Sequence, residues 1–163
     1  MAQDYTFQPS PVRNAGAINT SVPSYEEGEW TPAITCATPG DLSVAYDYQF
    51  GRYLIIGNKI FVEGAIAPST FTHTTASGEV RITGLPSKVM TNSNSFRVPV
   101  GSLGFQGITK ANYTQFAPAI NSQETFLTIT CSGSAQNSVS LGITDIPTGG
   151  TVWLLFSIWY SSI

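Results

Sequence analysis

The sequence contains little charge. Only 10% of its 163 residues are Asp, Glu, Lys or Arg, against roughly a quarter in ordinary soluble domains. The net charge is −3, and the seven Lys and Arg residues are scattered along the chain. A domain that binds nucleic acid needs a basic patch that displaces counterions from phosphates. The charge therefore argues against a nucleic-acid partner.

Groups for metal binding and catalysis are also scarce. His73 is the single histidine, and Cys36 and Cys131 belong to no C-x-x-C pair, so no metal-ligand spacing is present. The sequence has neither a G-x-S-x-G nucleophile elbow nor a P-loop. A glycosidase-type carboxylate pair stays open, because its separation is not visible in a sequence. We therefore expect that the protein is not an enzyme and that it has no catalytic residues, metal site or cofactor.

The two cysteines have similar surroundings, since each follows Ile-Thr and precedes small residues and a glycine. Two such strand ends would form a disulfide if they lay side by side. Free buried thiols are favoured, because nothing at the start of the chain resembles an export signal to an oxidising compartment. The pairing of Cys36 with Cys131 is the alternative.

Long hydrophobic runs are absent. The longest, residues 152–160, is interrupted by Ser157 and falls far short of the roughly 20 residues that span a bilayer. We therefore expect no membrane insertion. Hydrophobic residues nevertheless make up 42% of the chain and aromatics 12%, which is enough for one folded core. The polarity comes from hydroxyl groups, with 18 Ser and 19 Thr.

The chain divides into an arm and a β-domain. Residues 1–24 contain Pro and Gly and keep no sustained hydrophobic period, so this segment cannot bury itself. We expect an extended arm that docks onto another protein through its few large apolar side chains, Tyr5, Phe7, Val12 and Ile18. A floppy terminus is the alternative. The remaining residues, 25–163, form the predicted domain.

Short apolar segments separated by Gly, Pro, Asn and Ser are typical of β-structure. The clearest hairpin joins residues 52–56 to residues 59–67 through Gly57 and Asn58, which tolerate the positive φ of a two-residue turn. Other predicted strands cover residues 33–36, 43–50, 79–83, 96–103, 105–109, 125–131, 138–143 and 151–160. About ten short strands without a convincing helix predict an all-β, antiparallel β-sandwich that is jelly-roll-like.

The last predicted strand is apolar on both faces. Alternate residues of a strand point to opposite sides, which puts Val152, Leu154, Phe156, Ile158 and Tyr160 on one face and Trp153, Leu155, Ser157 and Trp159 on the other. A strand of a one-sided antiparallel sheet should have a polar face. We therefore expect Trp153, Leu155 and Trp159 to contact another subunit of a homo-oligomer. A central strand within one subunit is the alternative.

Three sequence blocks follow one another in residues 25–86. Residues 25–32 read Y-E-E-G-E-W-T-P, residues 51–64 read G-R-Y-L-I-I-G-N-K-I-F-V-E-G, and residues 84–86 read G-L-P. Together they resemble a β-domain that is widespread in bacteriophage tail-fibre and other virion-surface proteins. Leu54 and Ile55 stand where that family often has Thr-Lys, which indicates extra burial of this strand. Physically, Trp30 can cap the sandwich, Gly51 allows a bulge or tight entry, and Gly84 ends a strand sharply.

The resemblance implies a virion structural domain that is often a trimer and in some members recognises host-surface glycans. The sequence shows neither heptads nor a repeat for a shaft. We therefore expect a compact oligomeric knob, a homotrimer by preference, that residues 1–24 dock onto a capsid or tail protein of the same particle. It would be a decoration protein, head fibre or short fibre, assembled in the host cytoplasm and displayed on the virion surface.

Two other functions stay open: a receptor-binding tail-fibre adhesin that recognises host glycans, and a free carbohydrate-binding module. Sugars stack on aromatic rings and exchange hydrogen bonds with planar polar groups. The candidate glycan contacts are therefore Phe71, His73, Asn112, Tyr113, Gln115 and Phe116. For Tyr113 and Phe116, a core or interface position is the simpler interpretation.

Overall fold

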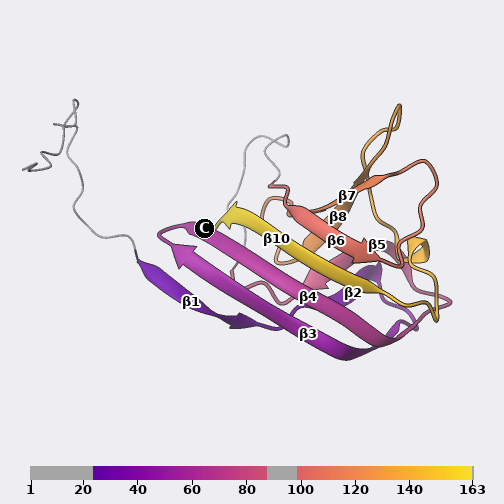
Figure 1. The fold of residues 1–163 in the computed structure, drawn as a ribbon, viewed down its shortest axis with the longest axis horizontal. Helices are drawn as coiled ribbons and strands as arrows, with labels where there is room; N and C mark the ends of the chain where they lie inside the picture. Colours follow the sequence, from indigo (N-terminus) through magenta and orange to yellow (C-terminus); the bar gives the residue numbers. More distant parts are fainter. Residues whose placement is uncertain (1–23, 88–98, 163) are drawn as a thin grey trace, which may run out of the picture.

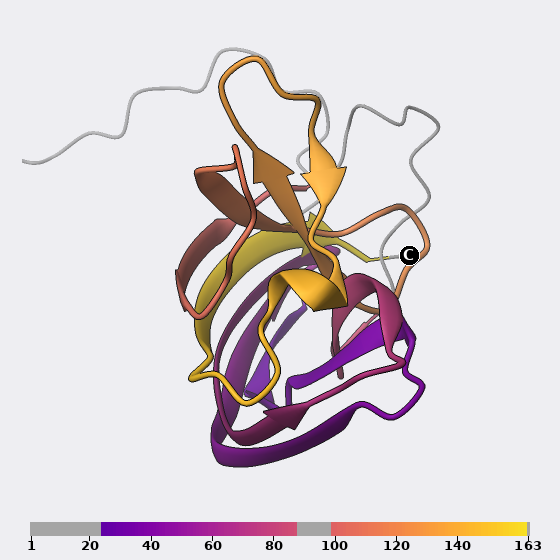
Figure 2. The same cartoon turned by 90° about the vertical axis from the view of Figure 1, so that its right-hand side faces the viewer.

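The computed structural model describes residues 24–87 and 99–162. The predicted docking residues Tyr5, Phe7, Val12 and Ile18 lie outside the described residues. Within the described ranges the chain forms two antiparallel sheets of five strands each, and Figures 1 and 2 show this fold from two directions at right angles. The predicted all-β sandwich is confirmed.

The first sheet, sheet A, has the strand order β1 (Tyr25–Trp30), β3 (Ser43–Ile56), β4 (Lys59–Thr72), β10 (Trp153–Ser161) and β6 (Ser102–Gln106). The second, sheet B, has the order β2 (Ala33–Thr38), β5 (Ser77–Thr83), β8 (Leu127–Ser132) and β7 (Gln115–Ala119), with the short β9 (Val139–Ser140) beside β8. Among the described residues, helical structure is confined to one 3-10 turn, η1 (Ile143–Asp145). Sheet A thus gathers strands from both ends of the domain.

The hydrophobic core lies between the two sheets. β4 contributes Ile60, Val62 and Ile66, and β10 contributes Leu154 and Ile158, none of which is more than 2% exposed. Burying a side chain of this size stabilises the fold by roughly 1.5–3 kcal/mol. Because these residues occupy alternate positions, the intervening residues of β4 and β10 point away from the core.

The observed strands correct several predicted boundaries. The hairpin at Gly57 and Asn58 is confirmed, but residues 43–50 and 52–56 form one strand, β3, of 14 residues. The separate strands predicted at 96–103 and 105–109 are wrong, because a single strand, β6, crosses that boundary, and residues 96–98 lie outside the described residues. Residues 138–143 contain only the two-residue β9 before the chain turns into η1.

Two strands escaped prediction. β1 contains three glutamates and has no alternation of apolar and polar residues, so its conformation depends on its pairing with β3. β7 contains Pro118, which favours an edge strand, and β7 does lie at the edge of sheet B. Both segments are strands because they pair with a strand distant in the sequence, and local β-propensity does not predict such pairing.

Cys36 and Cys131 are free and buried, on β2 and β8. β5 lies between these strands in sheet B, so the two thiols are not on adjacent strands. Burial raises the pKa of the Cys131 thiol to about 11. The expectation of free buried thiols is confirmed, and the alternative pairing is not observed.

Residues of the three sequence blocks meet around Trp30. Its Nε1 donates to the carbonyl oxygens of Arg52, at 3.2 Å, and Glu63, at 3.1 Å, and its ring makes an edge contact with Phe156, with centroids 6.0 Å apart. Gly51 faces the indole, whereas the register shifts in β3 fall at residues 45–48. Gly51 therefore makes room for Trp30 and is not a bulge, while Gly84, with φ +98°, ends β5 as expected.

Candidate assembly face and groove

Large exposed hydrophobic side chains gather in two places. Eight such residues occur among the described ones. Strand register places five of them on the outer face of sheet A: Tyr25, Tyr48, Ile56, Leu155 and Trp159. The other three line a separate groove: Val100, Phe105 and Val139. These two surfaces are the candidate functional sites, and we call the first the assembly face.

β10 positions the centre of the assembly face. Its inward residues, among them Phe156 and Tyr160, are buried, whereas Leu155 is 49% and Trp159 is 52% exposed on the outward side. Trp153 shares the outward side and is half-buried. The three residues predicted for a subunit interface thus lie on one face of one strand, and two of them are open to solvent in the single chain.

Neighbouring strands extend the apolar surface across sheet A. In one cross-strand row Trp159 pairs with Phe61, whose ring centroid lies 5.0 Å from that of Trp159, and Phe61 pairs with Leu54. Leu54 itself is half-buried. A further row crosses the sheet parallel to this one and consists of Phe50, Ala65, Leu155 and Gly104. Beyond it lie two cross-strand pairs, Tyr48 with Ala67 and Trp153 with Gln106.

A charged row separates the apolar rows. Arg52 on β3 lies opposite Glu63 on β4 and opposite Glu29 on β1. The Arg52 guanidinium lies over the Phe50 ring, 5.2 Å from its centroid. At the β1 edge, a hydrogen bond from the Tyr25 hydroxyl to Glu27 raises the pKa of Tyr25. The face therefore combines apolar area with charges of both signs, which two copies could satisfy mutually.

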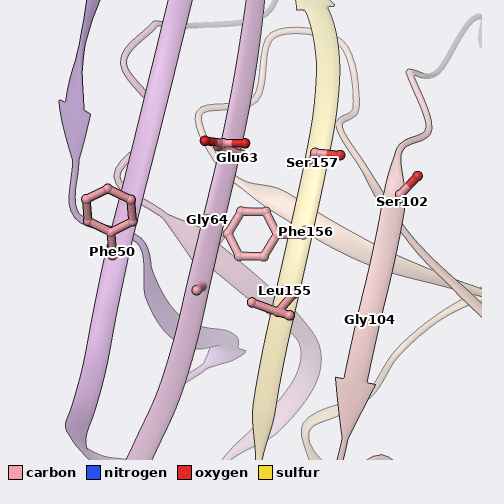
Figure 3. Close-up of a pocket in the computed structure, with 9 residues that line it drawn as sticks. Phe50, Glu63, Gly64, Ser102, Gly104, Leu155, Phe156 and Ser157 are labelled. Atoms are coloured by element: carbon pink, nitrogen blue, oxygen red, sulfur yellow. The ribbon is translucent and has the colours of Figure 1, made fainter.

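A shallow groove of about 370 Å³ crosses the middle of the assembly face. Figure 3 shows its surroundings, with Phe50 on β3, Glu63 on β4, Leu155 on β10 and Ser102 on β6. Its other lining residues are mostly small: Gly64, Ala65, Gly104 and Ser157, with Phe156 beneath. Small side chains leave a hollow that a protruding side chain of a partner can fill.

The predicted glycan contacts divide between core and surface. Phe71 is only 2% exposed, and its ring meets the His73 ring edge-on. His73 is half-buried, and its Nε2 lies 2.9 Å from the carbonyl oxygen of Ile146. Phe71 is thus a core residue, and its prediction as a glycan contact is wrong. The threonines around it suggested an exposed segment.

The four remaining candidates lie before and within β7. Asn112 has a positive φ of 67° in the preceding turn. The Tyr113 hydroxyl donates to the carbonyl oxygen of Asn137, at 3.2 Å, and its ring lies under the Lys110 ammonium. Gln115 and Phe116 line the second surface, a groove of about 940 Å³. The structure therefore brings two of the six candidates together in one concave site.

Sequence reasoning did not identify most residues of either surface. Tyr48, Ile56 and Phe61 belong to the assembly face. Within residues 48–62, apolar side chains occur on both faces of the predicted strands, and this was the signal that could have revealed them. Among residues 24–87 and 99–162, no group of three or more His, Cys, Asp or Glu residues could hold a metal ion. The same ranges contain no helix long and apolar enough to cross a membrane.

Comparison with known proteins gives one similarity of fold. No protein-family model matches the sequence, and no curated protein matches it. The crystal structure of Dettilon tailspike protein (gp208) superposes with a TM-score of 0.60 at 14% sequence identity, over 84% of this chain. The fold is shared with part of a tailspike. The chain spans only 24% of the tailspike's length, so the similarity concerns one domain-sized region of that protein.

Proposed function

We propose that the protein is a structural component of a bacteriophage virion, a β-knob whose copies associate through the assembly face. The observation that carries the proposal is that five of the eight large exposed hydrophobic side chains share the outer face of one sheet. A monomer gains nothing from keeping Leu155 and Trp159 about half exposed on one strand, whereas an oligomer buries them.

The chemistry of the face fits a permanent interface. Interfaces between identical subunits are more apolar than ordinary protein surface, and Trp and Tyr are the residues that most often dominate binding energy. The assembly face offers Trp159, Trp153, Tyr48 and Tyr25. Ser and Thr hydroxyls can be buried at such an interface at a lower desolvation cost than ions.

Two similarities support placement on a phage particle. The sequence blocks in residues 25–86 resemble virion-surface β-domains, and the fold is shared with part of a tailspike. Homotrimers are frequent in the family that the sequence resembles, so we propose a trimer. Residues 1–24 would dock the knob onto a capsid or tail protein, as a decoration protein, head fibre or short fibre on the virion surface, after assembly in the host cytoplasm.

Substitution of the assembly face tests this function. Leu155→Ser combined with Trp159→Ser should convert the oligomer into a monomer in sedimentation velocity, because both side chains leave the interface. Val139→Ser is the matched control, since Val139 is a comparably exposed hydrophobic residue, at 38%, on the other surface. An oligomer that the double variant leaves intact, and folded by circular dichroism, would refute the proposed interface.

The second candidate function is recognition of a glycan on the host surface, as in a receptor-binding adhesin. The groove that contains Gln115 and Phe116 favours it. A free carbohydrate-binding module would use the same groove but act as a monomer away from any particle. The oligomeric state therefore separates the module from the two virion functions.

A further inference from the structure

The groove of about 940 Å³ is lined by residues of β6, β7, β8 and β9 and of their connecting loops. In Figure 2, β8 and β9 (orange to gold) project as a hairpin at one end of the sandwich. The segments that meet here are separated in the sequence by up to about 40 residues, from Val100 to Ser140. The groove is distinct from the assembly face, with which it shares no lining residue.

Strand register arranges the polar lining as a grid. Thr130 on β8 lies between Ser140 on β9 and Ala117 on β7, and Ser132 lies opposite Gln115. Neighbouring strands are about 4.8 Å apart, and alternate residues on one face repeat about every 7 Å. Hydrogen-bonding groups therefore recur at regular intervals along and across the groove, while the small side chain of Ala117 leaves space above it.

Aromatic and aliphatic side chains form the apolar part of the lining. The Phe105 ring packs edge-on against Phe116, with centroids 4.8 Å apart. Phe105 is nonetheless 37% exposed, and Val100 and Val139 are 59% and 38% exposed. A ligand with an apolar face would cover these side chains, and binding sites commonly combine such a surface with a few placed polar groups.

The lining of the groove is uncharged. None of the described residues that line it is Asp, Glu, Lys, Arg or His. An anionic or cationic ligand would lose part of its hydration without gaining an opposite charge. Ser and Thr hydroxyls each donate and accept, and the amides of Gln115 and Asn121 do the same with separate atoms. The lining therefore complements a neutral ligand that is itself rich in hydroxyl groups.

We propose that this groove binds an uncharged oligosaccharide. Thr130, Ser140 and Gln115 exchange hydrogen bonds with sugar hydroxyls, and Phe105 packs against the C–H face of a sugar ring. The inference specifies the ligand class of the second candidate function, on which it rests, and does not require association through the assembly face.

The test uses the full chain on an array of immobilised glycans, with neutral oligosaccharides of glucose, galactose, mannose and N-acetylhexosamines beside sialylated and uronic-acid glycans. We expect saturable binding to at least one neutral structure and none to the acidic ones. Phe105→Ala and the double variant Thr130→Val, Ser140→Ala should each weaken that binding by about tenfold or more, through lost packing and lost hydrogen bonds.

Two controls make the result specific. Thr70→Val repeats the loss of one hydroxyl on an exposed position of β4 in sheet A, outside the groove lining, and should leave binding unchanged. Leu155→Ser with Trp159→Ser changes the assembly face alone, so a monomeric variant that still binds the monovalent sugar in calorimetry separates this inference from the proposed assembly.

No binding to any neutral oligosaccharide, binding confined to acidic glycans, or binding that the groove variants leave unchanged would each overturn the inference. A fold check by circular dichroism accompanies every variant. Phe105→Leu provides a milder change if Phe105→Ala unfolds the domain, and it should still weaken binding measurably.

Discussion

The indole ring of Trp30 fills the space beside Gly51 in which any other residue would carry its Cβ. The two residues are directly opposite each other in the β1–β3 ladder. Tyr53 uses Gly28 in the same way, and Phe156 uses Gly64. Aromatic rings thus lie over glycines along sheet A, which explains physically why both residue types recur in the sequence blocks.

Gly51→Ala should destabilise the domain, because the added methyl group meets the Trp30 ring and the two hydrogen bonds of Nε1 hold that ring in place. Overpacking of this kind costs about 1–3 kcal/mol, measured as the loss of unfolding free energy in urea. Gly142→Ala is the matched control, since a Cβ there meets only ordinary contacts at 3.4 Å and beyond and Gly142 lies outside the assembly face. Equal stability of the two variants would contradict the packing described for Trp30.

Asp41 ties two loops together and should make stability depend on acid pH. Its carboxylate accepts hydrogen bonds from the backbone N–H and hydroxyl groups of Thr74 and Thr75 and from the N–H of Ala76. The hydroxyl of Thr74 and the backbone N–H groups of Thr74 and Thr75 hold the pKa of Asp41 well below its usual range. A depressed folded-state pKa stabilises the fold above the ordinary pKa of about 4, and this stabilisation disappears as the pH falls through the folded-state pKa.

Asp41→Asn should therefore reduce the dependence of thermal stability on pH below pH 4, where the wild-type protein loses stability as it is acidified. Asp47→Asn, at an exposed carboxylate of β3, is the control and should keep the wild-type slope. Melting temperatures recorded from pH 2 to pH 7 decide the matter. If Asp41→Asn and the wild type decline in parallel, the carboxylate does not act as described.

The cysteines should be unreactive in the folded protein. Cys36 and Cys131 are 2% and 0% exposed, and burial raises the pKa of Cys131 to about 11, so little thiolate exists at neutral pH. A colorimetric thiol reagent should detect no fast-reacting group in the native state and two after denaturation. Fewer than two thiols in the denatured, unreduced protein would reveal a disulfide.

Deletion of residues 1–24 should leave a folded oligomer that no longer joins the particle. The described domain begins its first strand at Tyr25, and its described core residues run from Trp30 to Tyr160. Incorporation is measured by mass spectrometry of purified particles. The particles carry a deletion of the gene, and the host supplies either the full or the shortened chain. Normal incorporation of the shortened chain would show that docking uses another surface.

The sequence predicted those parts of the fold that local chemistry specifies. Gly57 and Asn58 fix a tight turn, and the period-2 pattern of residues 152–160 separates a buried face from an outward one, as the structure has them. β1 and β7 could not be found this way, because their strand conformation comes from pairing with β3 and β8. Only tertiary structure decides such segments.

The same limit applies to the candidate sites. The outward residues of β10 were visible because both faces of that strand are apolar, but their continuation to Phe61 and Leu54 depends on the order of strands in sheet A. The groove joins Phe105 to Thr130 and Ser140, which no spacing rule connects. Phe71 misled for the opposite reason, since threonines surround a residue that tertiary packing buries.

Association through the assembly face makes a direct prediction about the mass of the native protein in solution. One chain has a mass of 17.4 kDa. Multi-angle light scattering of the wild-type protein at micromolar concentration should give an oligomeric mass, three times that of the chain for the proposed trimer. A single species of 17.4 kDa would contradict the proposed association, because Leu155 and Trp159 would then stay exposed on a protein that does not associate through them.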